Sequence, residues 1–462
     1  IINKKWQIID YRSLTRVLSM KYESMTKKAL KIKMENLGSV ASFFIFIPAL
    51  FLIFPFFVNG AFVAHRRTLV RSPSKVLSIA PSPDVSAEEE RRTFLLKTSS
   101  AAVASPSLFL PTQSSVAATE LDYTTTIPLS GGIEIPPIGI GAWAWGDSLF
   151  WGYDPSKDGD LESVFDYSLE QKIVPFYDTA ELYGLGRSEK LLGKYCAASG
   201  ERADKVVIAT KFAAVPWKTQ AKDVVDACLQ STKRLGGRKI DLYQIHFPNA
   251  WSNDAYWDGL AQCVEQGLVR SVGVSNYSSE ALRAVHKALK ARGIPLATNQ
   301  IQMNLLYRFP LENGLMDTCN ELGVQVLAYS PLCLGFLTGK YRKGGDLPSG
   351  PRGKLAEKLF ESDGFEGLLQ TMEDVAQKSG GKDTTLSQVA LNWCRAKGSI
   401  PIPGARTVKQ ASQNIGCLSW KLSNDDLMAL DEAASRVPAY IEPDKSPFAK
   451  KDINTGMIMF DS

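Results

Sequence analysis

The sequence predicts an α/β fold: a (β/α)8 barrel, or TIM barrel, with an N-terminal β-hairpin. Two observations carry this prediction. From residue 120 onward, short apolar runs typical of buried strands alternate with amphipathic helical patterns. The alternation repeats eight times within about 310 residues, and eight strand–helix units are what close a single barrel.

The predicted elements follow one another along the chain. The hairpin lies at 124–135, where Ser130-Gly131-Gly132 joins two apolar runs. Strands are predicted at 138–143, 173–177, 206–212, 240–246, 269–275, 297–303, 324–329 and 399–402. One helix is predicted to begin at Ser188, which would be its N-cap. The other helices are predicted at 161–169, 224–235, 257–264, 281–289, 315–322, 365–376, 386–396, 408–417 and 425–434.

A doubly wound dinucleotide-binding domain is the alternative fold. Residues 139–144 (GIGAWA) approach its G-x-G-x-x-G pattern. However, no acidic residue closes a second strand about 20 residues later, as that motif requires. Gly139 and Gly141 are better explained as small residues where the first strand meets its loop, so the barrel is the preferred prediction.

Charge is distributed unevenly along the chain. Residues 1–118 hold 16 Lys/Arg and 7 Asp/Glu, a net charge of +9, whereas the remainder carries −4. The predicted barrel, 119–462, therefore has no cationic surplus for a polyanion, and nucleic acid is not an expected partner.

Residues 1–118 are predicted to be a largely disordered targeting leader. The apolar run 40–58 carries no charge and is long enough for a bilayer span. Small residues at 59–61 suit a signal peptidase, so a cleaved signal and a retained membrane anchor both remain open. For the mature barrel, no stable membrane insertion is expected.

The rest of the leader has two further features. Residues 62–90 are rich in Ser, Pro, Arg and Ala, and a signal peptide followed by Phe and such a stretch resembles the bipartite plastid leaders of algae with secondary plastids. Arg91-Arg92 and the later Val116-Ala117-Ala118 resemble a twin-arginine export signal, although two adjacent arginines also occur by chance. These resemblances imply a plastid (chloroplast) protein of the stroma or the thylakoid lumen.

The seven cysteines include no C-x-x-C pair and fall within apolar patterns. Buried free thiols in a reducing compartment are therefore expected, which fits a thylakoid lumen poorly.

Four polar residues stand at the carboxyl ends of three consecutive predicted strands. Asp178 and Tyr183 follow the second strand, Lys211 ends the third, and His246 ends the fourth. Each alone has an ordinary explanation: a turn residue, a rim aromatic, a strand end and a core histidine. Together they indicate a site, because a barrel closes these strand ends onto one mouth.

The four residues match the catalytic tetrad of the aldo-keto reductases, whose signature the stretch 176–193 resembles. The resemblance implies NADPH-dependent reduction of a small aldehyde or ketone, with Tyr183 as proton donor. Lys211, held by Asp178, would lower the pKa of Tyr183, and His246 would orient the carbonyl oxygen. The other histidines, His65 and His286, offer no partner for a metal site, and none is predicted.

The resemblance also implies a cofactor site on the later strands. Asn276 and Gln300 would bind the nicotinamide carboxamide, Tyr329 would stack on its ring, and the loop to Lys340 would cover the pyrophosphate. The expected cofactor-binding residues are Ser275, Asn276, Gln300, Tyr329, Ser330, Leu332, Gly335, Leu337, Lys340, Gly404, Arg406, Gln410, Gln413 and Asn414.

The anion site after the eighth strand departs from the classical family pattern. Gly404-Ala405 and Gln410 stand where those members grip the 2′-phosphate with Lys-Ser and a later Arg. Arg406 and Lys409 would replace that charge, as in the branch that includes the potassium-channel β subunits. NADPH is thus favoured over NADH, and a non-catalytic nucleotide-sensing subunit is the alternative function.

Substrate identity is not predicted. The loops around the expected mouth carry Trp145, Trp151, Trp217 and Trp251, which would favour apolar or aromatic carbonyl compounds unless these rings serve packing alone.

Overall fold

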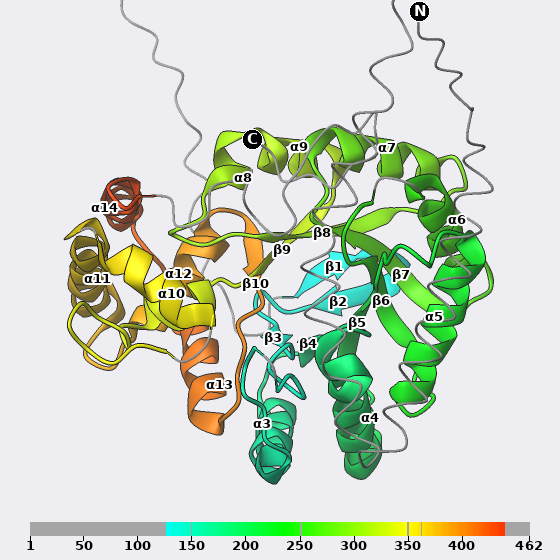
Figure 1. Cartoon of the computed structure of the whole chain (residues 1–462), viewed down its shortest axis with the longest axis horizontal. Coiled ribbons are helices and arrows are strands. Elements are labelled where there is room, and N and C mark those ends of the chain that lie inside the picture. The colour runs from blue at the N-terminus through cyan, green and yellow to red at the C-terminus, as the bar shows by residue number, and fades with distance from the viewer. Residues whose placement is uncertain (1–125, 149, 250–251, 349–350, 362, 439–462) are drawn as a thin grey trace, which may run out of the picture. The chain divides into compact units, whose positions relative to one another are not determined.

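The computed structural model describes residues 126–148, 150–249, 252–348, 351–361 and 363–438 (Figure 1). At its centre, eight parallel strands lie side by side in chain order. They are β3 (Ile140–Gly141), β4 (Phe176–Asp178), β5 (Val207–Phe212), β6 (Ile240–Ile245), β7 (Val269–Ser275), β8 (Leu296–Gln302), β9 (Gln325–Tyr329) and β10 (Ser399–Pro401).

The first and last strands close the sheet into a barrel. The backbone N–H groups of Gly139 and Gly141 donate to the carbonyls of Pro401 and Pro403, each at 2.9 Å. A Cβ added to Gly141 would lie 2.8 Å from the Ile402 carbonyl oxygen, closer than real contacts allow. The two glycines therefore serve barrel closure, and the predicted barrel is confirmed.

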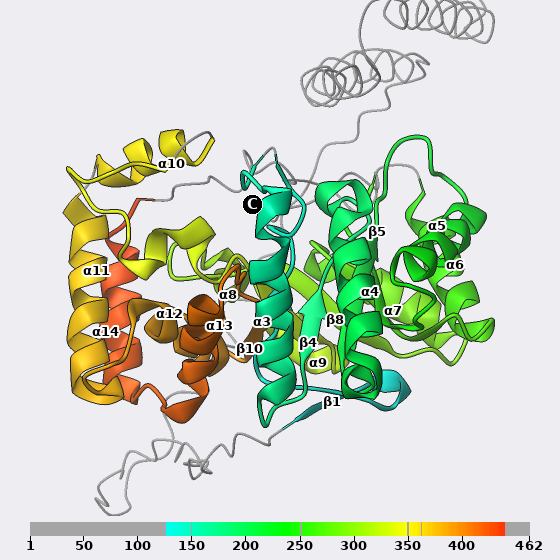
Figure 2. The same ribbon diagram turned by 90° about the horizontal axis from the view of Figure 1, so that it is seen from below.

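Helices cover the outside of the sheet, as Figures 1 and 2 show. They include α3 (Asp158–Glu170), α4 (Arg187–Ser199), α5 (Ala221–Arg234), α6 (Asn253–Glu265), α7 (Ser279–Lys290), α9 (Leu315–Leu322), α12 (Leu386–Ala396) and α13 (Val408–Ile415). Beyond α12, α11 (Asp363–Val375) packs against α14 (Asn424–Ser435). The helices next to the sheet turn their apolar stripes toward it, whereas α11 and α14 bury theirs mainly against other helices, so all of them show apolar residues at helical spacing.

The hairpin closes one end of the barrel. Its strands β1 (Ile127–Leu129) and β2 (Ile133–Ile135) pair in antiparallel fashion, as predicted. Ile133 and Ile135 are buried in one apolar cluster with strand residues such as Phe176 and Leu242. The carboxyl ends of the strands form the other end of the barrel.

Three local predictions need correction. The first strand is regular only at 140–141. Ala142 N–H still bonds to the Asp178 carbonyl of β4 at 2.8 Å, but the chain then turns, with Trp145 N–H donating to the Ala142 carbonyl at 3.0 Å. Ser188 is not an N-cap. The helix begins at Arg187 after Gly186, while the Ser188 hydroxyl donates to the Ala142 carbonyl at 2.9 Å. The helices α8 (Phe309–Glu312) and α10 (Pro351–Phe360) lie in segments for which no helix was predicted.

The cysteines are all buried free thiols, as expected. Among the described residues, no helix has the length and apolar character that crossing a membrane requires. The predictions for the leader, including the apolar run 40–58, lie outside the described residues.

Candidate active site

Lys211 lies at the centre of a buried polar cluster at the carboxyl end of the barrel. Its ammonium donates to Oδ2 of Asp178 at 2.6 Å, to the Thr179 carbonyl at 2.9 Å and to the Tyr183 hydroxyl at 3.2 Å. The Lys211 side chain is fully buried, and that of Asp178 nearly so. The structure therefore brings together three of the four residues predicted from the sequence.

The loop after β4 presents Tyr183 to this cluster. Gly184, Leu185 and Gly186 all have left-handed backbones, with φ of 55°, 54° and 84°. A Cβ on Gly184 would meet the Gly146 carbonyl oxygen at 2.4 Å, so only glycine fits there. This tight packing fixes the position of the tyrosine next to Lys211.

His246 completes the group of four. Its ring lies edge-on to the Tyr183 ring, with centroids 5.7 Å apart. Among the described residues, its buried Nδ1 atom has no hydrogen-bond partner. The imidazole thus faces the same space as the tyrosine hydroxyl and has capacity for a further contact.

Burial sets the protonation states of this cluster. It raises the pKa of Tyr183 well above its usual value, and the carboxylate of Asp178 adds to this effect. Burial also lowers the pKa of Lys211, with Asp178 opposing the change. The pKa of His246 falls well below its usual range, first through burial and then through Lys211. In the free protein the phenol of Tyr183 therefore stays protonated and the imidazole of His246 stays neutral at pH 7, and the acidifying effect of Lys211 on Tyr183 stays a prediction.

A second set of hydrogen bonds joins three predicted cofactor residues to the cluster. Gln300 Nε2 donates to Oδ1 of Asp178 at 2.7 Å. The carbonyl of Gln300 accepts from the Ser275 hydroxyl at 2.7 Å and from Asn276 N–H at 2.9 Å. Asn276, left-handed at φ 62°, donates from Nδ2 to the His246 carbonyl at 3.1 Å. Strands β7 and β8 therefore support the groups on β4 to β6.

Tyr329 extends this network from β9, since its hydroxyl donates to Oδ1 of Asn276 at 3.0 Å. Ser330 follows with φ 49°, and its carbonyl accepts from Asn304 Nδ2 at 3.0 Å.

Aromatic rings form one wall beside Tyr183. The Trp143 ring stacks on Phe150 at 4.9 Å between centroids and lies 6.2 Å from the Tyr183 ring, tilted by 28°. Trp151 packs edge-on against Trp143 at 5.4 Å. These planar surfaces beside the tyrosine ring suit a flat substrate.

The other tryptophans of the predicted mouth have different places. Trp145 is buried in the core and donates to the Ala405 carbonyl at 2.8 Å, so it serves packing. Trp217 is 67% exposed. Trp251 lies outside the described residues.

The loop after β9 turns sharply through residues predicted to cover a pyrophosphate. Cys333, Leu334 and Gly335 have φ of 46°, 55° and 98°, an unusual run of left-handed backbone. The Leu332 carbonyl accepts from Gly335 N–H at 3.0 Å and from Leu337 N–H at 3.2 Å. The N–H groups of Cys333, Gly335 and Leu337 are thus used within the loop, and contact of this loop with a pyrophosphate stays a prediction.

Two side chains of this loop differ in their suitability for contacts with a ligand. Leu337 is fully buried in the core, so only its backbone is available. Lys340 is exposed, with its ammonium 5.1 Å from the centre of the Tyr341 ring.

The segment from Gly404 to α13 carries the remaining predicted residues. Arg406 N–H donates to Oε1 of Gln410 at 2.8 Å, and Asn414 Nδ2 donates to the Gly404 carbonyl at 3.4 Å. Gln413 is half-buried. Arg406 also donates from Nη1 to the Trp151 carbonyl at 3.1 Å, which ties this segment to the aromatic wall.

Arg352, on α10, was missed by sequence reasoning. It lies close enough to Arg406 that the repulsion of the two charges, after burial, lowers the pKa of Arg406. Its buried Nε has no partner among the described residues. Its helix was not predicted, and only the run of basic residues around it, Arg352-Gly353-Lys354, could have drawn attention to it.

Comparison with known proteins decides the assignment. The sequence pattern of the Aldo/keto reductase family matches residues 137–435. The chain belongs to the aldo-keto reductase family. It is accordingly an oxidoreductase, and the match covers nearly the whole described part of the chain.

Named relatives agree with this assignment. This aldo-keto reductase is 42% identical over 323 residues to pyridoxal reductase, chloroplastic, from Arabidopsis thaliana, covering 67% of this chain and 86% of that protein. It is 29% identical over 317 residues to the aldo-keto reductase yakc [NADP(+)] of Schizosaccharomyces pombe, covering 66% and 89%.

Solved structures show the same architecture. The glycerol dehydrogenase from Gluconobacter oxydans is 28% identical, with a TM-score of 0.59 over 69% of this chain and 98% of that one. A thermostable aldo-keto reductase in complex with the inhibitor epalrestat is also 28% identical, with a TM-score of 0.54 over 67% of this chain and all of that one.

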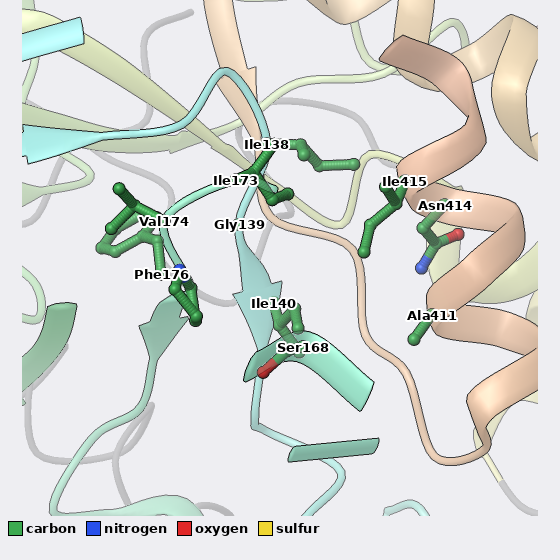
Figure 3. Close-up of a pocket in the computed structure, with 11 residues that line it drawn as sticks. Ile138, Gly139, Ile140, Ser168, Ile173, Val174, Phe176, Ala411, Asn414 and Ile415 are labelled. Atoms are coloured by element: carbon green, nitrogen blue, oxygen red, sulfur yellow. The ribbon is translucent and has the colours of Figure 1, made fainter. Parts of the chain in front are cut away.

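A hollow between α3 and α13 lies apart from the tetrad of this aldo-keto reductase (Figure 3). Apolar side chains such as Ile138, Ile173 and Ile415 line it, with Ser168 and Asn414 as its polar members. No ionisable group lines it, so it cannot supply the acid–base chemistry of a reductase. Asn414 lies in this hollow.

Proposed function

We propose that this aldo-keto reductase uses NADPH to reduce a small aldehyde or ketone to an alcohol, with Tyr183 as the proton donor. The observation that carries the proposal is the position of Lys211, which donates to both Asp178 at 2.6 Å and the Tyr183 hydroxyl at 3.2 Å. An ammonium beside a phenol stabilises the negative charge that develops as the proton leaves.

The remaining groups have complementary roles in this proposal. NADPH, when bound, supplies a hydride to the carbonyl carbon. The Tyr183 hydroxyl gives its proton to the carbonyl oxygen, so the C=O bond becomes CH–OH. His246, neutral because of its burial, donates one hydrogen bond to that oxygen and orients it. Asp178 holds Lys211 in place by accepting its hydrogen bond, and Gln300 in turn holds Asp178.

The residues present fit NADPH. Arg352 and Arg406 have no carboxylate partner among the described residues, and the buried Arg352 Nε has no hydrogen-bond partner there. These two side chains can therefore bind a phosphate. Asn276, Gln300 and Tyr329 hydrogen-bond to one another and are the residues that we expect to hold the nicotinamide. Three of the similar proteins point to the same cofactor: the S. pombe relative has NADP(+) in its name, and two Klebsiella pneumoniae structures of the same fold contain NADPH or NADP.

The substrate we propose is a planar aromatic aldehyde of the pyridoxal kind. Trp143 and Phe150 form a stacked aromatic wall next to Tyr183, and the relative at 42% identity is a pyridoxal reductase. A flat ring can lie against this wall with its aldehyde toward the tyrosine hydroxyl, whereas a branched aliphatic aldehyde gains less from such contact.

The test measures both cofactor binding and turnover. Calorimetric titration of the purified protein gives the NADPH affinity, and chromatography quantifies the alcohol formed from pyridoxal, with an aliphatic aldehyde for comparison. We expect NADPH binding and reduction of pyridoxal with the higher kcat/KM. Absence of NADPH binding would refute the cofactor assignment, and binding without turnover of any aldehyde would favour the nucleotide-sensing subunit.

We also propose that the protein acts in plastids, with residues 1–118 as a leader and 119–462 as the catalytic barrel. The support is the resemblance of the leader to plastid signals and the chloroplastic relative. A fluorescent protein fused after residue 118 should enter plastids in an algal host. Replacing Arg91 and Arg92 with lysine should hold the protein in the stroma if the twin-arginine signal is used. Fluorescence that stays in the cytosol or at the plasma membrane would contradict the plastid assignment.

A further inference from the structure

Trp151 connects the aromatic wall to the two arginines. Its ring touches Trp143 edge-on at 5.4 Å and lies under the Arg352 guanidinium, whose Cζ is 5.0 Å from the ring centroid. Its carbonyl accepts from Arg406 Nη1 at 3.1 Å. Three segments far apart in sequence, the loop after β3, helix α10 and the loop before α13, therefore meet at this one residue.

Two donors at this junction are buried without a partner. They are the indole Nε1 of Trp151 and the Nε of Arg352, and neither bonds to any described residue. An unpaired buried donor is costly, typically by about 1–3 kcal/mol, and a native structure normally compensates for it with a ligand or water. Two such donors on contacting side chains indicate a common acceptor.

The charge of the junction indicates what that acceptor is. Arg352 and Arg406 repel each other, and neither has an ion-pair partner among the described residues. Two guanidinium charges match a group with a charge near −2, which is the charge of a phosphate monoester at neutral pH. The pyrophosphate bridge of a coenzyme has the same total charge but spreads it over two phosphates, and the comparison of NADPH with NADH below distinguishes the two groups.

We propose that Trp151 is a further binding residue of the site, whose indole N–H and the Nε of Arg352 donate to one phosphate monoester while Arg406 neutralises it. This inference rests on the proposed function. The group we expect there is the 2′-phosphate of NADPH, which NADH lacks. A phosphate on the aldehyde substrate has the same chemistry, because Trp151 also borders the aromatic wall.

The test compares two coenzymes with the variant Trp151→Phe, which keeps an aromatic ring but removes the N–H donor. Calorimetry should show NADPH affinity lower by roughly 10- to 100-fold, the usual range for loss of a hydrogen bond to a charged group, with NADH affinity unchanged. Trp217→Phe is the matched control, because Trp217 is exposed and should affect neither coenzyme. Thermal melts of both variants check that the fold is intact.

Two further measurements identify which molecule carries the phosphate and whether Trp151 and Arg352 bind the same group. In the Arg352→Met background, Trp151→Phe should cost clearly less NADPH affinity than in the wild type, because both side chains hold the same group. If Trp151→Phe instead raises KM for pyridoxal 5′-phosphate but not for pyridoxal, and leaves both coenzymes unaffected, the phosphate belongs to the substrate.

Other results would overturn the inference. Equal losses for NADPH and NADH, full additivity with Arg352→Met, or no change with any phosphate-bearing ligand would show that Trp151 does not bind a monoester. If the wild-type protein binds NADPH and Trp151→Phe weakens that binding, but the wild-type protein reduces no aldehyde, the proposed reaction is refuted while the phosphate site remains supported.

Discussion

Gln300 donates a hydrogen bond from Nε2 to Oδ1 of Asp178 at 2.7 Å, across 122 residues of sequence. The other carboxylate oxygen accepts from Lys211 at 2.6 Å. Both oxygens of this buried carboxylate therefore accept a hydrogen bond, one from Gln300 on β8 and one from Lys211 on β5. A residue expected only to bind the cofactor therefore also positions the ion pair that supports Tyr183.

Gln300→Glu tests this positioning role. Two carboxylates in contact cannot both ionise, so the folded protein would hold one proton with a raised pKa. Between the usual glutamate pKa of about 4.3 and that raised value, the folded state binds more protons than the unfolded state, and stability falls as pH rises. The Tm difference from wild type should therefore grow from pH 5 to pH 8. Gln300→Met, which adds no charge, should be destabilised without this added pH dependence, and a flat difference for Gln300→Glu would argue against the contact.

Tyr183→Phe removes one hydroxyl and leaves the ring against Trp143. General-acid catalysis typically contributes about 10²–10⁴-fold, so kcat for aldehyde reduction should fall by that order. Affinity for NADPH should stay within a few-fold, and Tm should change little, because the ring packing is kept. Single-turnover kinetics and calorimetry separate the two effects. Near-normal reduction would make His246 the candidate acid instead.

Lys211→Met separates catalysis from stability. The change leaves the Asp178 carboxylate buried without its cation, and breaking such a pair typically costs about 3–5 kcal/mol. Adding Asp178→Asn should restore much of the Tm, because no uncompensated charge remains, but kcat should stay low. Urea unfolding of the single and double variants measures the first effect and steady-state assays the second. Recovery of activity in the double variant would mean that the ammonium has no role in catalysis.

The lowered pKa values of His246 and Lys211 predict the pH profile of reduction. His246 stays neutral through pH 6–7, where an ordinary histidine titrates, so kcat/KM should be flat there. On the alkaline side, Lys211 loses its proton below the usual lysine pKa of about 10.4, and the rate should fall as that charge is lost. A limb near pH 6.5 that disappears in His246→Gln would show that the histidine titrates after all.

Gly141→Ala tests the barrel closure. The added Cβ would lie 2.8 Å from the Ile402 carbonyl oxygen, a backbone atom that cannot move aside easily. A loss of about 1–3 kcal/mol in the free energy of unfolding is expected, as for other overpacked sites. Gly159→Ala is the matched control, because that glycine lies in α3 with open space around it, and alanine there should be neutral or stabilising. Equal Tm values for both variants would contradict the close approach of β3 and β10.

The sequence alone determined the alternation of strands and helices, because burial against one sheet imposes apolar periodicity on each element locally. It also placed Asp178, Tyr183, Lys211 and His246 at one end of the barrel, since parallel strands share the direction of their carboxyl ends. The helices at 386–396 and 425–434 agree with α12 and α14 to within a residue. These features depend on near neighbours in the chain.

Only the tertiary structure decided what depends on distant neighbours. The close approach of Gly141 to the Ile402 carbonyl explains why a glycine stands there, which the sequence pattern alone related both to a barrel strand end and to a dinucleotide-binding motif. The arginine pair could not be foreseen, since Arg352 and Arg406 come from separate segments. The pKa of Tyr183 is the clearest case. Residue types show the lysine that would lower it, whereas only the structure shows the burial of the phenol and the nearby carboxylate, both of which raise it.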